Sequence, residues 1–421
     1  MPEETTSPGE MAGSFRIARD KDDLMHPIDI DRARADTPGC DRVVHLNNAG
    51  GSLPPRVVTD AVVGYVQREA LTGAYEQAAM DADVIDRYRP AAASLLNADE
   101  SEIAFAFNDT LAFSTTFWGL AATGAIAPNS SVLVDRGVYV SHYLGLLQAE
   151  KQLGIKIRVI ESTADGSIDL ESLRSLLEEQ VSLVQLTHIG THRGLVNPVM
   201  EAGALIRSAG RAIYALDACQ SLGHIPVDVR AIDCDLLSGT GRKFLRAPRG
   251  TGLIFVSRRL LDRIDPPGID GHSANWIDQH TYQLLPDARR FEPFEVNMAT
   301  KVGLGVAIDY ALSWGIDAIA ERVTTLADLM RSLLTTNGIE VLDGGQRRSG
   351  IITFRLDHES PASTQHRLAA EGINTTVVRP GSARLDMETR GVSAAVRASV
   401  HYYNTVEEID RLMEVLSAPA R

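Results

Sequence analysis

The chain has 421 residues, of which 44% are hydrophobic and 23% charged, as is ordinary for a globular protein with a large core and two domains. Its net charge of −14 argues against a general nucleic-acid binder, because phosphate contacts need clustered lysine and arginine. The three cysteines (Cys40, Cys219, Cys234) show neither metal-ligand spacing nor a disulfide framework, and no apolar run is long enough for a membrane helix.

The amino-terminal segment is polar and lacks the apolar stretch of a secretory signal. We therefore expect a disordered extension over residues 1–25 and a cytoplasmic protein that contacts no membrane and has no metal site.

The next part of the chain alternates short apolar runs with longer helical patterns. Strands are expected at 131–135, 155–160, 182–187, 212–217 and 252–257, and helices at 169–179 and 200–208. This alternation predicts an α/β fold with a mostly parallel sheet covered on both faces. Ligands bind such sheets beyond the carboxyl ends of the strands, where Asp217, the loop after Thr187 and the loop with Lys243 would lie.

The pattern changes after about residue 291. Helices are expected at 301–314, 318–335, 363–371 and 405–417, and strands at 350–356, 373–378 and 396–401. This order is typical of a smaller α+β domain. We expect a large domain over 26–290, whose amino-terminal segment contributes to the small domain, and a small carboxyl-terminal domain over 291–421.

Lys243 and Asp217 together indicate a cofactor. A lysine amine can form a Schiff base with an aldehyde, and a carboxylate at the end of a buried strand can keep a pyridine nitrogen protonated. Pyridoxal 5′-phosphate (PLP) needs both, because its pyridinium is the electron sink for a substrate carbanion. The pair therefore predicts a PLP-binding, cofactor-dependent enzyme.

An anion site is expected near the same edge. Residues 107–112 form a turn into an apolar helix, and Asp109 or Thr110 could cap it, although a plain helix cap is the alternative. Thr240 and Arg242 add a hydroxyl and a guanidinium next to Lys243, and both groups suit a phosphate.

Taken together, these motifs resemble one family. The chain is similar to the class V aminotransferase group of PLP-dependent enzymes of fold type I, which includes the cysteine desulfurases. The resemblance covers about residues 45–416 and is carried by 45–50, 108–110, 187–199, 217–223, 238–243 and 397–405.

The resemblance implies a role for each matching residue. Lys243 would carry the cofactor and act as base or acid at the substrate α-carbon, with Asp217 at the pyridine nitrogen and Gln220 at the phenolic oxygen. The phosphate would be held by Asp109, Thr110, Thr240 and Arg242, and the substrate α-carboxylate by Arg397. A homodimer is implied, in which the segment beginning at Asn297 caps the phosphate of the neighbouring subunit.

Two positions depart from the family pattern. Thr191 stands where many relatives have an asparagine that contacts the cofactor oxygen. Many relatives also have a histidine that stacks on the cofactor ring, and here either Tyr139 or His142 could cover the ring.

The run from Thr191 to Gly194 locally resembles the hercynylcysteine sulfoxide lyases, as do residues 45–50 and 69–75. His192 and Arg193 would then lie over the cofactor edge and steer the substrate, and Asn48 would contact it. A loop-stabilising ion pair is the alternative for His192 and Arg193.

The sequence argues against a persulfide-forming desulfurase. No cysteine follows Cys234, and Ser382 stands where the resemblance places the catalytic cysteine. An amino-acid substrate would react through an external aldimine and a quinonoid, and we favour β-elimination by a carbon–sulfur lyase. Transamination, epimerisation and oxygen-dependent oxidation or oxidative decarboxylation stay open, whereas a non-catalytic scaffold would have no need to keep both Lys243 and Asp217.

Overall fold

The computed structural model describes residues 28–178, 180–210 and 212–418, so the extension expected over 1–25 lies outside the described residues. Within these ranges no single helix is long and apolar enough to span a membrane. One bent pair, α12 (Met298–Trp314) and α13 (Ile316–Thr336), passes that test of length and composition only when joined, with 76° between its two helices.

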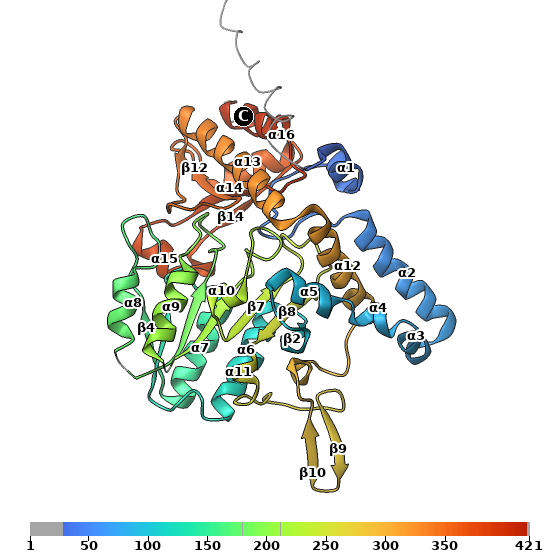
Figure 1. Ribbon diagram of the computed structural model, residues 1–421. Helices are drawn as coiled ribbons and strands as arrows, with labels where there is room; N and C mark the ends of the chain where they lie inside the picture. The colour runs from blue at the N-terminus through green and yellow to red at the C-terminus, as the bar shows by residue number, and fades with distance from the viewer. Residues whose placement is uncertain (1–27, 179, 211, 419–421) are drawn as a thin grey trace, which may run out of the picture.

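A seven-stranded sheet forms the centre of the part of the chain that runs from β2 to β8 (Figure 1). In spatial order its strands are β2 (Ile103–Ala106), β8 (Gly252–Val256), β7 (Leu236–Thr240), β6 (Ile213–Asp217), β5 (Val181–Thr187), β3 (Ser131–Val134) and β4 (Lys156–Val159). Only β8 runs against its neighbours, so the sheet is mixed but mostly parallel. The α/β fold predicted from the alternating pattern is confirmed.

Side chains of successive strand residues enter two separate cores. Ile213 and Ala215 of β6 pack with α6 (Asp109–Ala122) and α7 (Val140–Leu153), whereas Tyr214 and Leu216 pack in the core on the opposite face. That opposite core includes residues of α5 (Tyr88–Leu96), α8 (Leu170–Leu176), α9 (Val199–Ala209), α10 (Val229–Ile232) and α12. Since side chains alternate along a strand, Asp217 lies on the α6–α7 face.

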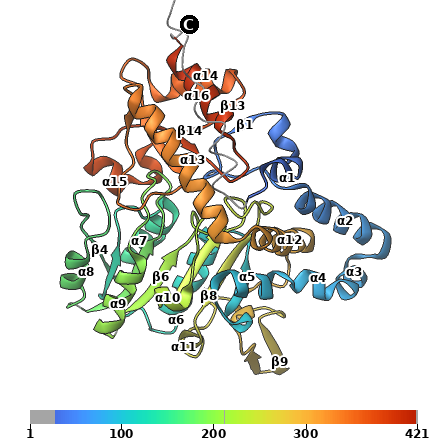
Figure 2. The ribbon, with the colours of Figure 1, turned by 45° about the horizontal axis from the view of Figure 1, so that its top comes forward.

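A second sheet belongs to the carboxyl-terminal part. Its order is β11 (Glu340–Val341), β12 (Ile351–Arg355), β15 (Ala395–Ser399) and β14 (Thr376–Val378), and all its pairs are antiparallel. Its helices are α13, α14 (Pro361–Ala370), α15 (Arg384–Thr389) and α16 (Val406–Ser417). In Figure 2, α13 leads from this part toward the large sheet.

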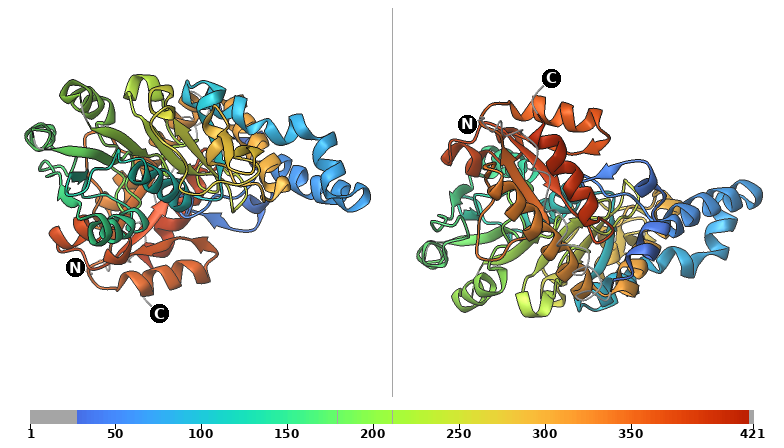
Figure 3. Two further views of the ribbon diagram at one scale, coloured as in Figure 1. Left: turned by 90° about the horizontal axis from the view of Figure 1, so that it is seen from below. Right: turned by 90° about the horizontal axis from the view of Figure 1, so that it is seen from above.

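The amino-terminal segment joins both parts. After α1 (Ile30–Ala35), strand β1 (Val44–His45) pairs in parallel with β13 (Ile373–Asn374), so it lies beside the carboxyl-terminal part (Figure 2). Then α2 (Arg56–Thr72), α3 (Ala74–Met80) and α4 (Ala82–Asp86) extend away from the body, as both views of Figure 3 show.

The chain between α11 (Arg258–Leu261) and α12 forms a hairpin that the alternating pattern did not predict. Strands β9 (Ala274–Asp278) and β10 (Thr281–Leu284) pair only with each other and project from the body (Figure 1). Most residues of these two strands are exposed. The hairpin is therefore supported by few contacts within the chain.

Candidate active site

The carboxyl ends of three neighbouring strands meet at one edge of the large sheet. Thr187 at the end of β5 pairs in register with Asp217, and Asp217 pairs with Ser238 of β7. Lys243 follows β7 in a turn, and its side chain is buried with 7% exposure. Its Nζ lies 6.0 Å from the ring centroid of Tyr139, the residue that precedes α7. The expected cluster at this edge is thus present in the structure.

The turn that carries Lys243 is held by the packing around the next residue. The Phe244 ring stacks on the His224 imidazole with centroids 3.8 Å apart, and the Phe244 carbonyl oxygen lies 3.0 Å from His401 Nε2. Burial lowers the pKa of His224 to about 4, so its ring is neutral at neutral pH and accepts a hydrogen bond from Gly350 N–H. These contacts fix the turn against the carboxyl-terminal part of the chain.

A buried histidine lies between two buried carboxylates on the α6–α7 face. His142 Nε2 is 2.8 Å from Asp109 Oδ2, and His142 Nδ1 is 3.9 Å from Asp217 Oδ2. The His142 ring also stacks on Phe113 with centroids 4.2 Å apart. His142 thus contacts both carboxylates, while Tyr139, the other candidate for covering a cofactor ring, lies near Lys243 Nζ.

The charges of this cluster are unequal. Burial raises the pKa of Asp109, but His142 and the Ser238 hydroxyl, which donates over 2.6 Å, outweigh it and bring the pKa to about 2. Burial and the charge of Asp109 raise the pKa of Asp217 to about 6, although His142 and Lys243 oppose the rise. Asp109 and His142 thus form an ion pair, and the charge of Asp217 is only partly offset by His142 and Lys243.

The same three groups have the spacing of a metal site. One ligand atom from each of Asp109, His142 and Asp217 lies within 4.8 Å of the others. However, Asp109 already pairs with His142 and Ser238, and Asp217 Oδ1 accepts from Cys219 N–H at 2.8 Å. We therefore interpret the cluster as an ion pair between Asp109 and His142, with the Asp217 carboxylate beside it.

Arg397 of β15 enters the site from the small sheet. Its Nη1 donates to both the carbonyl and the hydroxyl oxygen of Thr191, each at 2.8 Å, and its Nη2 donates to Asn47 Oδ1 at 3.2 Å. The Thr191 hydroxyl also accepts from Gln220 Nε2 at 3.2 Å. Burial lowers the pKa of Arg397 to about 10, so the guanidinium stays charged at neutral pH.

Asn48 differs from its expected role. Its side chain is fully buried, donating to Ser399 O at 2.7 Å and accepting from the Tyr403 hydroxyl. The neighbouring Asn47, which the motif did not single out, is the residue that contacts Arg397. Only the backbone path after β1 decides which of the two asparagines points into the site, so the sequence motif alone carried no such signal.

The anion end of the site is formed by the start of α6. Asn108 caps this helix by accepting from Leu111 N–H at 3.0 Å, so neither Asp109 nor Thr110 is the cap. Because the Asp109 carboxylate turns toward His142, only its backbone could serve an anion. Thr240 accepts from Arg242 Nη1 at 3.0 Å, which fixes that guanidinium.

His192 and Arg193 contact a carboxylate of α15. His192 Nε2 is 2.9 Å from Asp386 Oδ2, and Arg193 Nη1 is 3.2 Å from Asp386 Oδ1. All three residues are buried. This geometry favours the loop-stabilising interpretation of His192 and Arg193, because both side chains already contact Asp386 within the chain.

Asn297 lies at the surface, at the start of α12. Its side chain caps the helix by accepting from Thr300 N–H at 3.1 Å, and it is exposed. In this chain it therefore has a structural role, and any contact with a cofactor would come from a second subunit.

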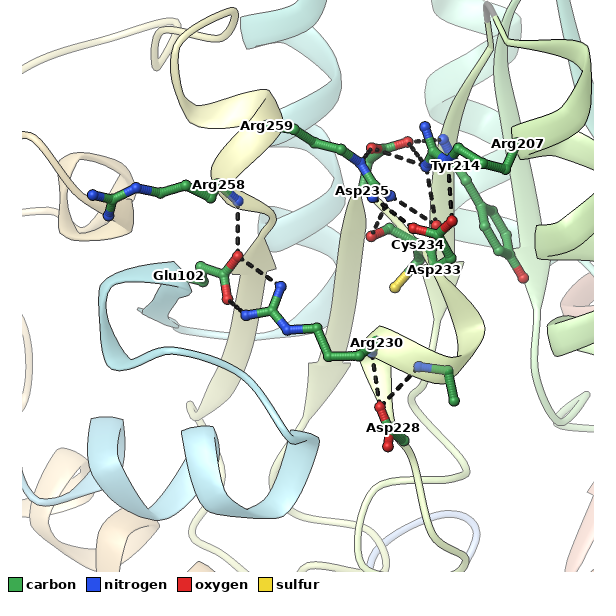
Figure 4. Close-up of polar contacts among 11 residues, drawn as sticks. Glu102, Arg207, Tyr214, Asp228, Arg230, Asp233, Cys234, Asp235, Arg258 and Arg259 are labelled. Atoms are coloured by element: carbon green, nitrogen blue, oxygen red, sulfur yellow. Dashed lines mark hydrogen bonds and ion pairs between the residues drawn. The ribbon is translucent and has the colours of Figure 1, made fainter.

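The charged groups of the site fit PLP. In the described residues neither Arg242 nor Arg397 pairs with a carboxylate, and the buried Nε of each has no hydrogen-bond partner. At the opposite end of β7, by contrast, the buried Asp235 is matched by Arg207 and Arg259 (Figure 4). The guanidiniums of Arg242 and Arg397 suit anionic groups such as a phosphate and a carboxylate. The Asp217 carboxylate suits a protonated pyridine nitrogen.

Sequence comparison supports the same conclusion. A family model described as Aminotransferase class-V matches residues 44–412. A probable cysteine desulfurase from Methanothermobacter thermautotrophicus is 30% identical over 393 residues, which are 91% of this chain and 96% of the relative. A cysteine desulfurase from Escherichia coli (strain SE11) is 29% identical over 408 residues, again 91% of this chain and 96% of the relative.

Solved structures share the fold. The apo cysteine desulfurase of Thermococcus onnurineus has a TM-score of 0.86 at 24% identity and covers 93% of this chain and 98% of its own. The cystine C-S lyase C-DES in complex with its product cysteine persulfide has a TM-score of 0.82 at 20% identity, covering 91% and 100%. A C-DES mutant with glycine covalently linked to the PLP cofactor gives 0.82 at 19%, covering 92% and 99%.

Proposed function

The chain belongs to the class V aminotransferase family of PLP-dependent enzymes, and from that premise we propose that it cleaves a carbon–sulfur bond of a small amino acid by β-elimination. The observation that carries the proposal is the placement of Lys243 and Asp217 at one sheet edge, beside the unmatched guanidiniums of Arg242 and Arg397. Such a site matches the cofactor phosphate, the pyridine nitrogen and a substrate carboxylate at once.

The chain's own groups divide the work. When bound, PLP supplies an electron-withdrawing ring that stabilises negative charge on the α-carbon of an attached amine. The Lys243 amine would take the proton from that carbon, and the Asp217 carboxylate would keep the ring nitrogen protonated. Arg242, Thr240 and the start of α6 would hold the phosphate, Tyr139 would lie beside the ring, and Arg397 would orient the substrate through its carboxylate.

Elimination is favoured over sulfur transfer to a protein thiol. Cys40, Cys219 and Cys234 are all buried, and burial holds the pKa of each thiol above its ordinary value. No cysteine lies beyond Cys234, and Ser382 occupies the loop before α15. Without an exposed thiolate near the substrate, the sulfur of a cysteine-like substrate would have to leave as a small molecule.

We also propose that the enzyme is a homodimer in the cytoplasm. The exposed start of α12 at Asn297 and the projecting β9–β10 hairpin support this assembly, because both are surfaces that a second subunit could cover.

We propose that His192 and Arg193 hold the edge of the site in place through Asp386 and do not touch the substrate.

The proposal is tested by incubating the holoenzyme with amino acids, S-substituted cysteines and their sulfoxides, with and without oxygen. We expect pyruvate and ammonia from an S-substituted cysteine or its sulfoxide, with no oxygen uptake. A keto acid other than pyruvate, a racemised substrate or peroxide would instead support transamination, epimerisation or oxidation.

Lys243→Ala is the matched control for this assay. It should keep the fold and release no product from any of these substrates, because the base at the α-carbon is lost. Borohydride reduction of the wild-type holoenzyme, followed by peptide mapping, should label Lys243. A label on another lysine would contradict the assignment.

A further inference from the structure

Arg246 ends the turn that carries Lys243, in a backbone conformation that arginine rarely adopts. Its N–H donates to the Lys243 carbonyl oxygen at 2.9 Å, and its φ of 61° lies in the left-handed region. Among the described residues, the other non-glycine positions with positive φ are Asn97, Asn129 and Asp233, whose residue types tolerate this region. Arginine has no such tolerance, so the contacts of its side chain have to offset the backbone cost.

The Arg246 side chain is a buried cation that is only 2% exposed, and none of the ion pairs among the described residues includes it. Its Nε donates to the Leu53 carbonyl oxygen at 2.8 Å, its Nη1 to the Tyr402 hydroxyl at 2.6 Å, and its Nη2 to the Thr37 hydroxyl. Its guanidinium carbon also lies 4.6 Å from the ring centroid of Tyr403, which is a cation–π distance. A buried charge without a carboxylate is costly, and here the planar fork offsets the cost by contacting several segments at once.

Two of the segments that Arg246 contacts also support Arg397. One is the stretch with residues 402–403, which continues the chain after β15, the strand that carries Arg397. The other is the loop after β1, which supplies the carbonyl acceptor and also Asn47, whose Oδ1 accepts from Arg397 Nη2 at 3.2 Å. Arg246 therefore ties both of these segments to the turn that carries Lys243.

We propose that Arg246 is a positioning residue, whose guanidinium clamps the Lys243 turn to the two segments that support Arg397 and so fixes the place of the Lys243 amine. The inference rests on the proposed function, since it needs Lys243 to react with PLP. Lys243 follows a strand of the large sheet and Arg397 lies in the small sheet, so strand pairing does not set their relative positions. An error of about 1 Å in the place of a reacting atom can lower a rate about 100-fold.

The test measures how fast the Lys243 amine captures PLP, a step in which the amine nitrogen adds to the aldehyde carbon and water leaves. PLP is added to the cofactor-free protein, and the growth of the visible absorption band is followed by stopped flow. Pyridoxine 5′-phosphate is the matched probe, because it has the same phosphate and pyridine ring but an alcohol in place of the aldehyde. Its Kd reports whether the site is intact, independently of the Lys243 amine.

Two substitutions separate the side chain of Arg246 from its backbone. Arg246→Gly removes the guanidinium and suits the positive φ, whereas Arg246→Lys keeps a charge but loses the planar fork. Tyr402→Phe removes one acceptor of the fork and keeps the ring, so it serves if neither Arg246 variant folds.

Arg367→Lys is the matched control for loss of an arginine fork. Arg367 pairs with Glu359 at 2.6 Å and donates to the Val415 carbonyl oxygen, so it ties α14 to α16. In Figure 2 both helices lie at the outer end of the carboxyl-terminal part, away from the large sheet.

We expect capture of PLP to slow about tenfold or more in Arg246→Gly and Arg246→Lys, and by a smaller factor in Tyr402→Phe. The Kd of pyridoxine 5′-phosphate should stay as in wild type, because the phosphate and ring contacts do not depend on the amine. Arg367→Lys should match wild type in both measurements.

Capture at the wild-type rate in Arg246→Gly, or in Tyr402→Phe if only that variant folds, would overturn the proposal, because the turn would then not depend on the fork. Slower capture with an equal rise in the Kd of pyridoxine 5′-phosphate would also overturn it, because the whole site would be disturbed and not only the place of the amine. If wild type forms no visible band with PLP, the proposed function itself fails, and this outcome is seen before any variant is compared.

Discussion

Asp217 is a buried carboxylate whose free energy depends on the group that faces it. Burial and Asp109 raise its pKa to about 6 from an ordinary 3.8, so in the cofactor-free protein its ionised form is disfavoured. A carboxyl group whose pKa is higher in the folded than in the unfolded state does not change the free energy of unfolding below its unfolded pKa. As pH rises from the unfolded to the folded pKa, the group lowers the free energy of unfolding. For Asp217 this loss of stability should therefore develop between about pH 4 and pH 6.

We predict that Asp217→Asn stabilises the cofactor-free protein at pH 7.5 by roughly 2 kcal/mol, while the PLP-loaded variant loses most of its turnover. An amide carries no charge to bury, but it cannot hold a proton on the pyridine nitrogen. Urea denaturation of the cofactor-free proteins between pH 4.5 and 7.5 measures the difference, which should shrink toward the acid end. A difference independent of pH, or a variant with wild-type turnover, would contradict this account.

Residue chemistry could be predicted from the sequence better than side-chain direction. Lys243 and Asp217 were singled out because an amine and a strand-end carboxylate have one shared use in PLP chemistry, and the structure places both at the same sheet edge. Asn47 and Asn48 could not be told apart, because one residue of backbone phase decides which side chain reaches Arg397. The sequence likewise did not give the direction of the Asp109 side chain. We assigned it to the phosphate, but in the structure its carboxylate points to His142.

At the scale of elements, apolar runs located β3, β4, β5, β6 and β8 of the large sheet, whereas the fully buried β2 was not predicted. Residues 373–378 were expected as one strand, but they form β13, which pairs with β1, and β14, which pairs with β15. Strand β7 went unpredicted because its sequence, Leu236–Thr240, includes serine, glycine and threonine, and it is the pairing with β6 and β8 that keeps it extended. Tertiary pairing, which local pattern does not contain, decided both cases.

Helix α15 is tied to the loop after β5 by one buried carboxylate. Asp386 contacts His192, Arg193 and Arg390, and although burial opposes ionisation, these partners hold its pKa well below the ordinary value. Removing one partner of a buried ion pair leaves the others uncompensated in a poorly solvated place. The contact therefore holds α15 against the loop that follows β5.

We predict that Asp386→Asn lowers the free energy of unfolding by about 3 kcal/mol at pH 7. Because the folded-state pKa of Asp386 is depressed, its contribution is present above the unfolded pKa and declines as pH falls below about 4, so the gap should narrow there. Glu388→Gln is the matched control: the same helix pairs it with Arg384 at the exposed surface, and we expect little change. Equal stability of wild type and Asp386→Asn by chemical denaturation would exclude this role for the contact.

At the scale of the whole molecule, the hairpin is one of the places where large apolar side chains are exposed. On and next to the hairpin, Trp276 is 81% exposed, Ile277 61%, Tyr282 58% and Phe294 52%. Trp276 pairs with Tyr282 across the hairpin, and Phe294 lies three residues before Asn297, the residue that caps the start of α12. Exposed apolar side chains on a projecting element are typical of a protein interface.

We predict that the protein is a homodimer at micromolar concentration and that Trp276→Glu shifts it toward monomer. A buried interface tryptophan contributes about 2 kcal/mol or more, so dimer affinity should fall by about 30-fold or more, and a charge at the same position adds a desolvation cost. Light scattering over a dilution series measures the dissociation. Met200→Glu is the control, because Met200 is 50% exposed on α9, on another side of the molecule from the hairpin in Figure 1.

If the neighbouring subunit caps the phosphate near Asn297, the Trp276→Glu monomer should also release PLP more readily and lose turnover. A wild-type monomer with full activity would refute the assembly, and a Trp276→Glu dimer of wild-type affinity would place the interface elsewhere.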